Sequence, residues 1–514
     1  MREVTPTEMR FLLFSRRTRF LLLTCGVFLG IFGTVEAATI NARSVALADV
    51  SAAISLAHDG DTVLVPAGTS TWTTPLTIAK PITLQGAGIG QTIVIDGLTA
   101  DNNNLAFPTL LGKYYRLTGF EFRAGARTKI FGKGCVLFSG STKTFRVDHC
   151  KFDGIYNRSL YFRGSACGVI DHCTFANPQV PVFTFYHDAW VNPDGKPGSW
   201  GDGSWASPID WGGPNAIYIE DNTLSKAGDV FSIIDEYAGA RFVFRHNTVT
   251  NGHIASHGTG STGRYRSLRQ WEIYDNTFVA NPPTAKNTIH IRGGTGAVFN
   301  NTVTNYNQFL TLHTYRFYQY FADWSGSDGM SSWDKNDPAG VYLSGTASTG
   351  SKNLTLVVAG SHWTTGQWKG YTVKCTTTSS LYPSGYFHSC VVSNTADTII
   401  VNGGSQITEK PFAAGAHFEI RKVVQSLDMV GASTGNLLDP ATQPSPRWLN
   451  QAIDPVYVWN NKLSGVNSPI MADSPIREGI HFFNGQAKPN YQPYTYPHPL
   501  TGPAPPSNLQ IAGQ

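Results

Sequence analysis

The sequence predicts an all-β solenoid, a chain wound into stacked coils of short strands. Four Asn-Thr phrases follow alternating apolar strands between Ala216 and Tyr315, and their asparagines lie 25, 29 and 25 residues apart (Asn222, Asn247, Asn276 and Asn301). A repeat of this length is typical of solenoid proteins. Charged residues make up only 14% of the chain, which also holds 52 glycines. This composition favours an extracellular all-β protein over a helical one.

The repeated asparagine suits a bend between two strands, because asparagine tolerates a left-handed backbone and hydrogen-bonds locally. Successive coils stack about 4.8 Å apart and bury their apolar faces in a continuous core. We therefore expect equivalent asparagines to hydrogen-bond to one another as an asparagine ladder. Two earlier phrases carry cysteine at this position, expected as buried thiols, and a late phrase restores asparagine (Cys150, Cys173 and Asn461).

The Asn-Thr turns, the coil length and the inward Val, Ile and Phe pattern resemble the right-handed parallel β-helix of the pectate-lyase-like superfamily. The resemblance covers residues 38–315 and resumes near Val456. It implies a right-handed parallel β-helix whose open N-terminal end is capped by a helix, since uncovered strand edges invite aggregation. Residues 46–59 have helical spacing and fit this cap, and residues 81–96 fit the first coil.

Residues 1–37 are predicted to be a secretory signal peptide. Arg16, Arg17 and Arg19 directly precede an apolar run of 13 residues (20–32), and Val35-Glu36-Ala37 offers small residues at a cleavage site. The run is short for a membrane span, so we expect a secreted, extracellular or periplasmic protein without stable membrane insertion after cleavage. An uncleaved anchor is the alternative. The net charge of +4 gives no indication of a nucleic-acid partner.

Two segments depart from the repeat. The loop 185–214 carries Trp190, Trp200, Trp205 and Trp211, which either bind sugar rings or pack the loop onto the solenoid; Trp190, Trp205 and Trp211 are the candidate substrate contacts. Residues 316–423 are predicted to form an inserted loop and a small β-sandwich-like domain, in which Cys375 and Cys390 could pair across a hairpin. Residues 424–514 are predicted to form the final coils and a Pro/Tyr-rich C-terminal tail along the outside.

Aligning the coils on the asparagine position predicts a column of polar side chains on the outer face, because side chains alternate along a strand. This column comprises Arg163, Asp235, His257, Arg292 and His313. A shift of register by one residue would place Glu236 there instead of Asp235. The loop after His257 adds Arg264 and Arg266, and His290 shares a face with Arg292. A salt-bridged ladder that only stabilises the stacking is the alternative for this column.

Such a column suits β-elimination on an acidic sugar chain, which needs neutralisation of a carboxylate, a base and an acid. His257 is the candidate base. Arg292 is the candidate carboxylate clamp, since a guanidinium fork matches a carboxylate, and Arg163 would bind the neighbouring sugar. Asp235 and Glu236 could hold Ca²⁺ through oxygen ligands or orient His257. The candidate substrate contacts from this region are Arg264, Arg266, His290 and His313.

The sequence therefore predicts a carbohydrate-active protein whose partner is a polysaccharide, with a lyase acting on a uronate-containing polysaccharide as the first hypothesis. A glycoside hydrolase is the second, because Asp235 with Asp229 or Glu236 would supply the two carboxyl groups that hydrolysis requires. A non-catalytic surface or matrix protein that binds glycan along the solenoid is the third. The Asp-rich phrases of β-helix polygalacturonases and the calcium-binding Asp clusters of pectate lyases are not recognisable. No oligomeric state is predicted.

Overall fold

The computed structural model describes residues 37–127, 132–191, 199–258, 265–313, 341–368, 372–377, 386–388, 391–401, 412–421, 428–434, 451–473 and 476–502. Residues 1–36 of the predicted signal peptide lie outside these ranges. Within the described ranges, no helix is both long enough and apolar enough to span a membrane.

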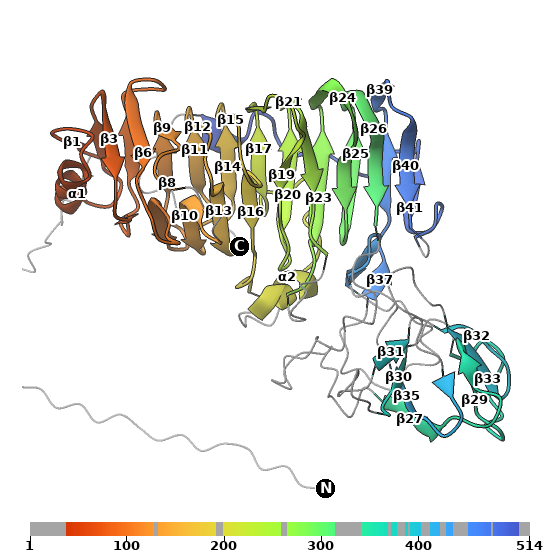
Figure 1. The fold of residues 1–514 in the computed structure, drawn as a ribbon. Helices are drawn as coiled ribbons and strands as arrows, with labels where there is room; N and C mark the ends of the chain where they lie inside the picture. The colour runs from red at the N-terminus through yellow and green to blue at the C-terminus, as the bar shows by residue number, and fades with distance from the viewer. Residues whose placement is uncertain are drawn as a thin grey trace, which may run out of the picture. The chain divides into compact units, whose positions relative to one another are not determined.

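The chain forms a parallel β-helix, as predicted, in which each coil contributes one strand to each of three stacked rows (Figure 1). The first row is a sheet of 12 parallel strands, in this order: β1 (Thr39–Asn41), β2 (Thr62–Val65), β5 (Thr83–Gly86), β8 (Tyr115–Thr118), β11 (Phe145–Asp148), β14 (Gly168–Asp171), β17 (Ile217–Glu220), β20 (Arg241–Arg245), β23 (Gln270–Tyr274), β25 (Thr295–Phe299), β38 (Val456–Trp459) and β41 (Phe482–Asn484).

The second and third rows join into one sheet, because the long strands β24 (Thr277–Ile291) and β26 (Thr302–Leu312) run through both. The second row also contains β3 (Gly68–Trp72), β6 (Thr92–Asp96), β9 (Glu121–Arg123), β12 (Lys151–Asp153), β15 (Thr174–Ala176), β18 (Thr223–Ser225), β21 (Thr248–Thr250) and β39 (Lys462–Ser464). The third row also contains β4 (Leu76–Thr77), β7 (Leu105–Thr109), β10 (Gly134–Gly140), β13 (Arg158–Gly164), β16 (Phe183–Phe185), β19 (Phe231–Ile234), β22 (Gly252–Ala255) and β40 (Ser468–Ala472).

Inward side chains at equivalent positions stack from coil to coil and fill the core. In the third row, the ring of Phe162 lies between those of Phe138 and Phe185, with centroid distances of 5.6 and 5.4 Å. In the second row, Phe152 stacks on Phe175 at 5.2 Å. Aromatic burial of this kind dominates core energetics, so the repeated apolar positions bind the coils together.

A helix closes the N-terminal end of the core, at the position predicted for the cap (Figure 1). In α1 (Leu47–Leu56), the side chains of Val50, Ala53 and Ile54 are buried in the main hydrophobic cluster. The Lys80 ammonium donates hydrogen bonds to the carbonyls of Ile54, Ser55 and Ala57 at 2.6–3.0 Å. A cation is favourable there because the C-terminal carbonyls of a helix carry partial negative charge.

The repeated asparagines are buried, and their side chains hydrogen-bond from one coil to the next. Each Nδ2 donates to the Oδ1 of the following asparagine at 2.9–3.1 Å, in the order Asn222, Asn247, Asn276, Asn301 and Asn461. Cys173 continues this series, since its backbone N–H donates to Asn222 Oδ1 at 2.8 Å, and Cys150 and Cys173 are buried free thiols. The left-handed residue is the one before each asparagine, for example Asp221 at φ 56°, not the asparagine itself.

The insertion contains two antiparallel sheets, in agreement with the predicted small β-domain. One has the order β27 (Val341–Thr346), β35 (His417–Arg421), β30 (Thr372–Cys375) and β31 (Tyr386–His388). The other has the order β32 (Val391–Asn394), β33 (Thr398–Val401), β29 (Thr355–Val357), β28 (Lys352–Asn353) and β34 (Phe412–Ala413). Cys390 lies outside the described residues, so its pairing with Cys375 stays a prediction. A short antiparallel pair, β36 (Ala432–Thr434) and β37 (Gln451–Ile453), precedes β38.

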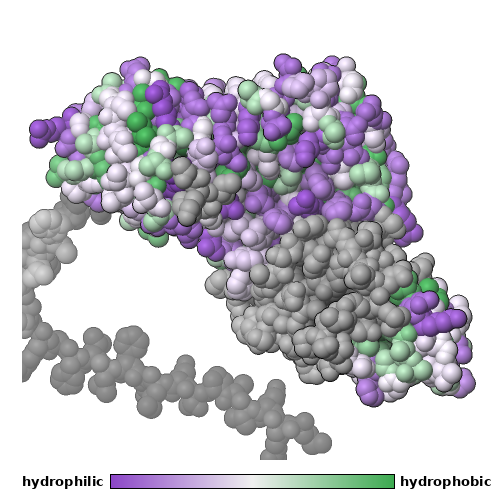
Figure 2. All heavy atoms as spheres, in the orientation of Figure 1, coloured by the Kyte–Doolittle hydropathy of each residue, from purple (hydrophilic) through white to green (hydrophobic). Residues whose placement is uncertain are grey.

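The C-terminal segment 485–502, which ends in the short 3₁₀ helix η5 (Pro499–Thr501), runs back over the outer face of the first row. Arg245 donates to the Tyr494 and Thr495 carbonyls at 2.7 and 2.9 Å. Tyr491 donates its hydroxyl hydrogen to the buried Glu272 carboxylate. The segment thereby covers an aromatic stripe that would otherwise face solvent, while Figure 2 shows hydrophilic residues over much of the visible surface of the β-helix.

Candidate active site

The outer face of the third row carries two adjacent columns of side chains. Strand pairing places one column at the ends of the strands, with the order Arg163, Tyr186, Tyr237, His257, Arg292 and His313. The neighbouring column contains Tyr161, Thr184, Asp235, Ala255, His290 and Thr311. Four of the five predicted residues therefore share one column. Asp235 was wrongly placed in it, and Tyr237 occupies its expected position.

His257 lies between a carboxylate and a phenol. Its Nε2 is 3.8 Å from Asp235 Oδ1, and the centroid of its ring lies 5.2 Å from that of Tyr237 in an edge-on arrangement. Arg158 Nη2 approaches the other carboxylate oxygen of Asp235 at 3.7 Å. The His257 and Asp235 side chains are 30% and 24% exposed, so both reach solvent from a partly desolvated position. Asp235 can therefore stabilise a proton on His257.

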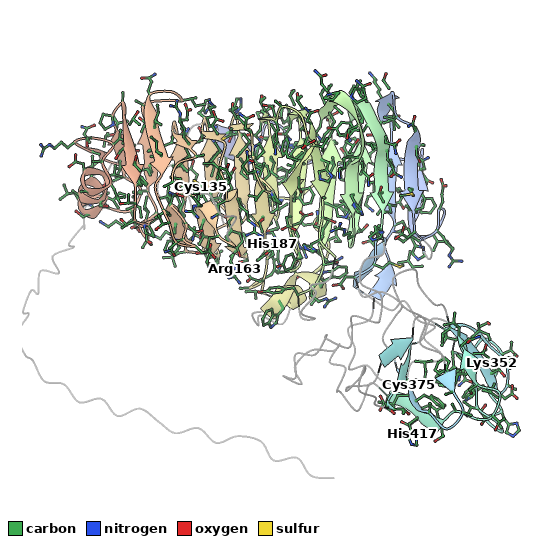
Figure 3. All side chains as sticks on the ribbon, viewed as in Figure 1. Cys135, Arg163, His187, Lys352, Cys375 and His417 are labelled. Carbon is green, nitrogen blue, oxygen red and sulfur yellow. The ribbon has the colours of Figure 1, made fainter. Side chains whose placement is uncertain are left out.

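Arg163 lies in the same column as His257 but is not a neighbour of His257, Asp235 or Tyr237, although it was predicted to be catalytic. It lies at the end of β13 (Figure 3), and the coils of Tyr186 and Tyr237 separate it from His257 by about 14 Å along the stack. Its guanidinium is paired with Asp188, whose other carboxylate oxygen accepts the Gly164 N–H at 2.8 Å. Arg163 is thus part of a local ion pair rather than a partner of His257.

Arg292 follows His257 in the column and stands next to two histidines. Its backbone N–H donates to Ser256 Oγ at 2.8 Å, which fixes the end of the strand. The His290 and His313 rings meet edge-on at 5.3 Å, and His313 Nδ1 contacts Asp473 Oδ2 at 2.5 Å. Burial, together with the nearby Arg292, lowers the pKa of His290 to about 3. His290 is therefore a neutral hydrogen-bonding group at pH 7.

Glu236 points into the core, opposite to Asp235, because consecutive side chains alternate along a strand. The residue is completely buried, and neither carboxyl oxygen has a hydrogen-bond partner among the described residues. Burial, and then the charge of Asp235, raise the pKa of Glu236 well above its usual range. The two carboxyl groups face opposite sides of the strand, so Asp235 and Glu236 do not jointly line one Ca²⁺ site, and a role for Ca²⁺ in this protein stays a prediction. The described chain also contains no group of three His, Cys, Asp or Glu residues able to hold a metal.

Three of the tryptophans predicted as candidate substrate contacts have the packing role that was the alternative for this loop. Trp190 is buried beneath the Lys143 ammonium, 3.9 Å from its ring centroid. Trp205 is 2% exposed, and its Nε1 donates to the Ser267 carbonyl at 2.9 Å. Trp211 packs against Tyr491 of the C-terminal segment, on the first row. None of the three presents an indole face to the His257 column, so they are not contacts of a substrate bound there.

Arg266 is also not a substrate contact. Its guanidinium is 1% exposed and holds the Asp428 carboxylate through Nε and Nη2 at 2.8 and 2.6 Å. Asp428 lies 162 residues further along the chain, so this ion pair ties the segment after the insertion to the β-helix. Arg264 lies outside the described residues, and its predicted role stays a prediction.

The sequence analysis missed a cluster of aromatic side chains beside His257. Tyr161, Tyr186, Tyr237 and Tyr265 pack together on the outer face, with ring centroids of neighbours 4.4–5.9 Å apart. Burial, followed by the effect of Tyr237, raises the pKa of Tyr186, so this phenol stays protonated. The sequence could have predicted this cluster, because Tyr186 and Tyr237 each follow an apolar strand at the same place in consecutive coils.

Comparison with known proteins gives similarities of fold only. No family model matches the chain, and no curated protein matches it. A polysaccharide lyase of family PL6 from Pseudopedobacter saltans is 16% identical, with a TM-score of 0.34 over 54% of this chain and 67% of the lyase. The mutant R241A of the PL6 alginate lyase AlyGC is 13% identical, with a TM-score of 0.32 over 54% of this chain and 41% of that one.

A tailspike protein of Escherichia coli bacteriophage HK620, solved with a pentasaccharide, is 11% identical. Its TM-score is 0.27 over 71% of this chain and 87% of the tailspike. These similarities are too distant to assign an activity. The parallel β-helix is established by the strand pairing of the chain itself.

Proposed function

We propose that this protein is an exported polysaccharide lyase that cleaves a uronate-containing polysaccharide on the outer face of the third row. The observation that carries the proposal is the position of His257, 3.8 Å from the Asp235 carboxylate and in edge-on contact with Tyr237. A histidine between a carboxylate and a phenol offers both a base and an acid within one site. Arg292 follows in the same column and supplies a fixed positive charge.

The proposed reaction is a β-elimination, in which every step uses a side chain of this column. Arg292 pairs with the uronate carboxylate, which stabilises the negative charge that develops when the α-proton leaves. His257 takes that proton, and Asp235 stabilises the resulting imidazolium. The electron pair forms the new C=C bond as the glycosidic C–O bond breaks. Tyr237 gives its hydroxyl proton to the departing oxygen, and proton exchange with solvent then restores both side chains.

Hydrolysis is less well served by the described side chains. It requires two carboxyl groups that flank the scissile bond. Glu236 faces the core, and Asp188 is held by Arg163 and the Gly164 N–H. Asp235 is therefore the carboxylate available beside His257. Hydrolysis would pair Asp235 with either Glu236 or Asp229. Glu236 points into the core and cannot flank a bound glycan, so Asp229, on an exposed turn, is the second carboxyl group that a hydrolase would need.

Glycan binding without catalysis is a second candidate function, because part of the column is ion-paired. Arg163 pairs with Asp188, and His313 pairs with Asp473, as the salt-bridged ladder would require. Such pairs stabilise the stacking of coils only modestly at an exposed surface. A glycan could bind across them through its hydroxyl groups without being cleaved.

The test is an activity screen of residues 38–514 against acidic and neutral polysaccharides, with ultraviolet absorbance and reducing ends recorded together. A lyase produces both signals, a hydrolase produces reducing ends alone, and a binding protein produces neither. His257→Ala and Tyr237→Phe should each lower the rate by at least about 100-fold, the usual contribution of a positioned acid or base. His149→Ala, at an exposed turn outside the third row, is the matched control and should keep wild-type activity.

A further inference from the structure

One tryptophan of the loop before β17 is presented to solvent. Trp200 is 37% exposed, more than any other tryptophan among the described residues. Its ring meets that of Tyr265 edge-on, with centroids 4.6 Å apart. Aromatic side chains are common in the lining of ligand-binding sites, so the position of this indole relative to the candidate active site decides its role.

The backbone of Trp200 is held in a conformation that a bulky residue rarely adopts. Its φ of 62° and ψ of 11° lie in the left-handed region, which is unfavourable for an L-residue with a bulky side chain. Its carbonyl accepts the Arg266 N–H at 2.9 Å. The next residue is Gly201, where a Cβ would lie 2.3 Å from the Ala238 carbonyl carbon. Strain of this kind persists where the surroundings fix it and often marks a functional position.

Two buried guanidinium groups hold the loop that carries Trp200. Arg241 donates to the Ser204 and Pro208 carbonyls at 2.7 and 2.8 Å, and Arg269 donates to the Ser207 carbonyl at 3.0 Å. Burial lowers the pKa of Arg241 to about 10 and that of Arg269 to about 9. Burying two like charges is unfavourable, and the hydrogen bonds of these two guanidinium groups hold the loop in place. The loop also contains α2 (Asp202–Ala206) (Figure 1).

A continuous file of rings joins Trp200 to the proposed base. The centroid distances are 4.6 Å from Trp200 to Tyr265, 5.0 Å from Tyr265 to Tyr237, and 5.2 Å from Tyr237 to His257. Trp200 is thus three ring contacts away from His257, and its exposed indole packs on the tyrosine cluster that borders the polar column.

We infer that Trp200 is a substrate-binding residue of this site, whose indole packs against the apolar face of a pyranose ring of an acidic polysaccharide. Aromatic faces complement the C–H faces of sugars, while neighbouring polar groups bind the hydroxyls and carboxylates. The identity of the polymer rests on the proposed function. The packing itself does not require cleavage, so binding and catalysis can be tested separately.

The test is the dissociation constant of uronic-acid hexasaccharides (mannuronate, guluronate and galacturonate), measured by calorimetry with wild type and three variants. Trp200→Ala should weaken binding of the preferred hexasaccharide by about tenfold or more, which corresponds to about 1.4 kcal/mol. Trp200→Phe keeps an aromatic face and should lose less than about threefold. Trp211→Phe changes a tryptophan on the first row and should bind as wild type. Circular dichroism and melting curves verify that each variant is folded.

Equal affinity of Trp200→Ala and wild type, or no binding of any hexasaccharide by wild type, would overturn this inference. If wild type binds a hexasaccharide and Trp200→Ala does not, without elimination by either, the lyase proposal fails and the packing role stands. If wild type cleaves the polymer and Trp200→Ala keeps its KM and affinity, the packing role fails and the lyase proposal stands. A raised KM with an unchanged kcat supports both.

Discussion

The buried carboxyl group of Glu236 makes stability depend on pH in a direction that can be worked out. Burial and the charge of Asp235 raise the pKa of Glu236 well above 4.5 in the folded protein. Above pH 4.5 the unfolded chain releases this proton while the folded protein keeps it. The folded state then binds more protons than the unfolded state, so the free energy of unfolding falls as pH rises toward the folded pKa.

Glu236→Gln removes this penalty, because glutamine has nearly the same shape and no proton to lose. The wild type should lose about 1.4 kcal/mol per pH unit relative to the variant between pH 4.5 and the folded pKa. We therefore expect the two proteins to have equal free energies of unfolding near pH 4. At pH 7 the free energy of unfolding of Glu236→Gln should be higher by at least about 1 kcal/mol. A buried amide replaces a buried neutral acid, so other desolvation costs largely cancel.

Urea unfolding followed by tryptophan fluorescence at pH 4–8 measures this difference. Glu121→Gln is the control of opposite sign. Burial alone would raise the pKa of Glu121, but hydrogen bonds and charge from Arg123 and Lys151 lower it, so this variant should be less stable than wild type at pH 7 and should approach it at low pH. A constant difference between Glu236→Gln and wild type, or a less stable variant at pH 7, would show that Glu236 is an ionised, partnered group.

Two other predictions concern the stacking of the coils. Phe162→Ala should lower the free energy of unfolding by about 3–5 kcal/mol, because its ring is fully buried between Phe138 and Phe185; a loss below about 1 kcal/mol by urea unfolding would mean that the core closes around the gap. Deletion of residues 486–514 should lower Tm and increase binding of a hydrophobic dye, because Tyr491 and the residues after it cover Tyr218 and Phe299; unchanged melting and dye binding would contradict a stabilising role.

The asparagine repeat made the β-helix and most of the outer column predictable. Five coils carry a buried asparagine whose side chain reaches the next coil of the series, so the period of this residue indicates the stacking. His257, Arg292 and His313 were aligned correctly, although they follow their asparagines by 10, 16 and 12 residues. Asp235 was not, because it lies two residues before Tyr237, the residue opposite His257; a bulge in β19 between Ser232 and Ile234 accounts for one of these two positions. An extra residue in one strand shifts every later side chain relative to its neighbours.

The roles of the loop residues depended on partners that are distant in the sequence. Arg266 is buried by Asp428, which lies beyond the insertion, and Trp211 is covered by the C-terminal segment through Tyr491. No local pattern in residues 185–214 distinguishes Trp200, which is exposed, from Trp205, which is buried. Composition therefore identified the loop as a candidate for function, while only the tertiary contacts show which indole faces solvent.

The central claim is elimination at His257, and the origin of the oxygen in the products tests it most directly. The polysaccharide that the activity screen identifies should be digested in water enriched in heavy oxygen, and the products analysed by mass spectrometry. Elimination breaks the C–O bond without adding water, so we predict unsaturated products without heavy oxygen from wild type, formed at least about 100-fold more slowly by His257→Ala. Products that carry heavy oxygen, or unsaturated products formed equally by His257→Ala, would contradict the account.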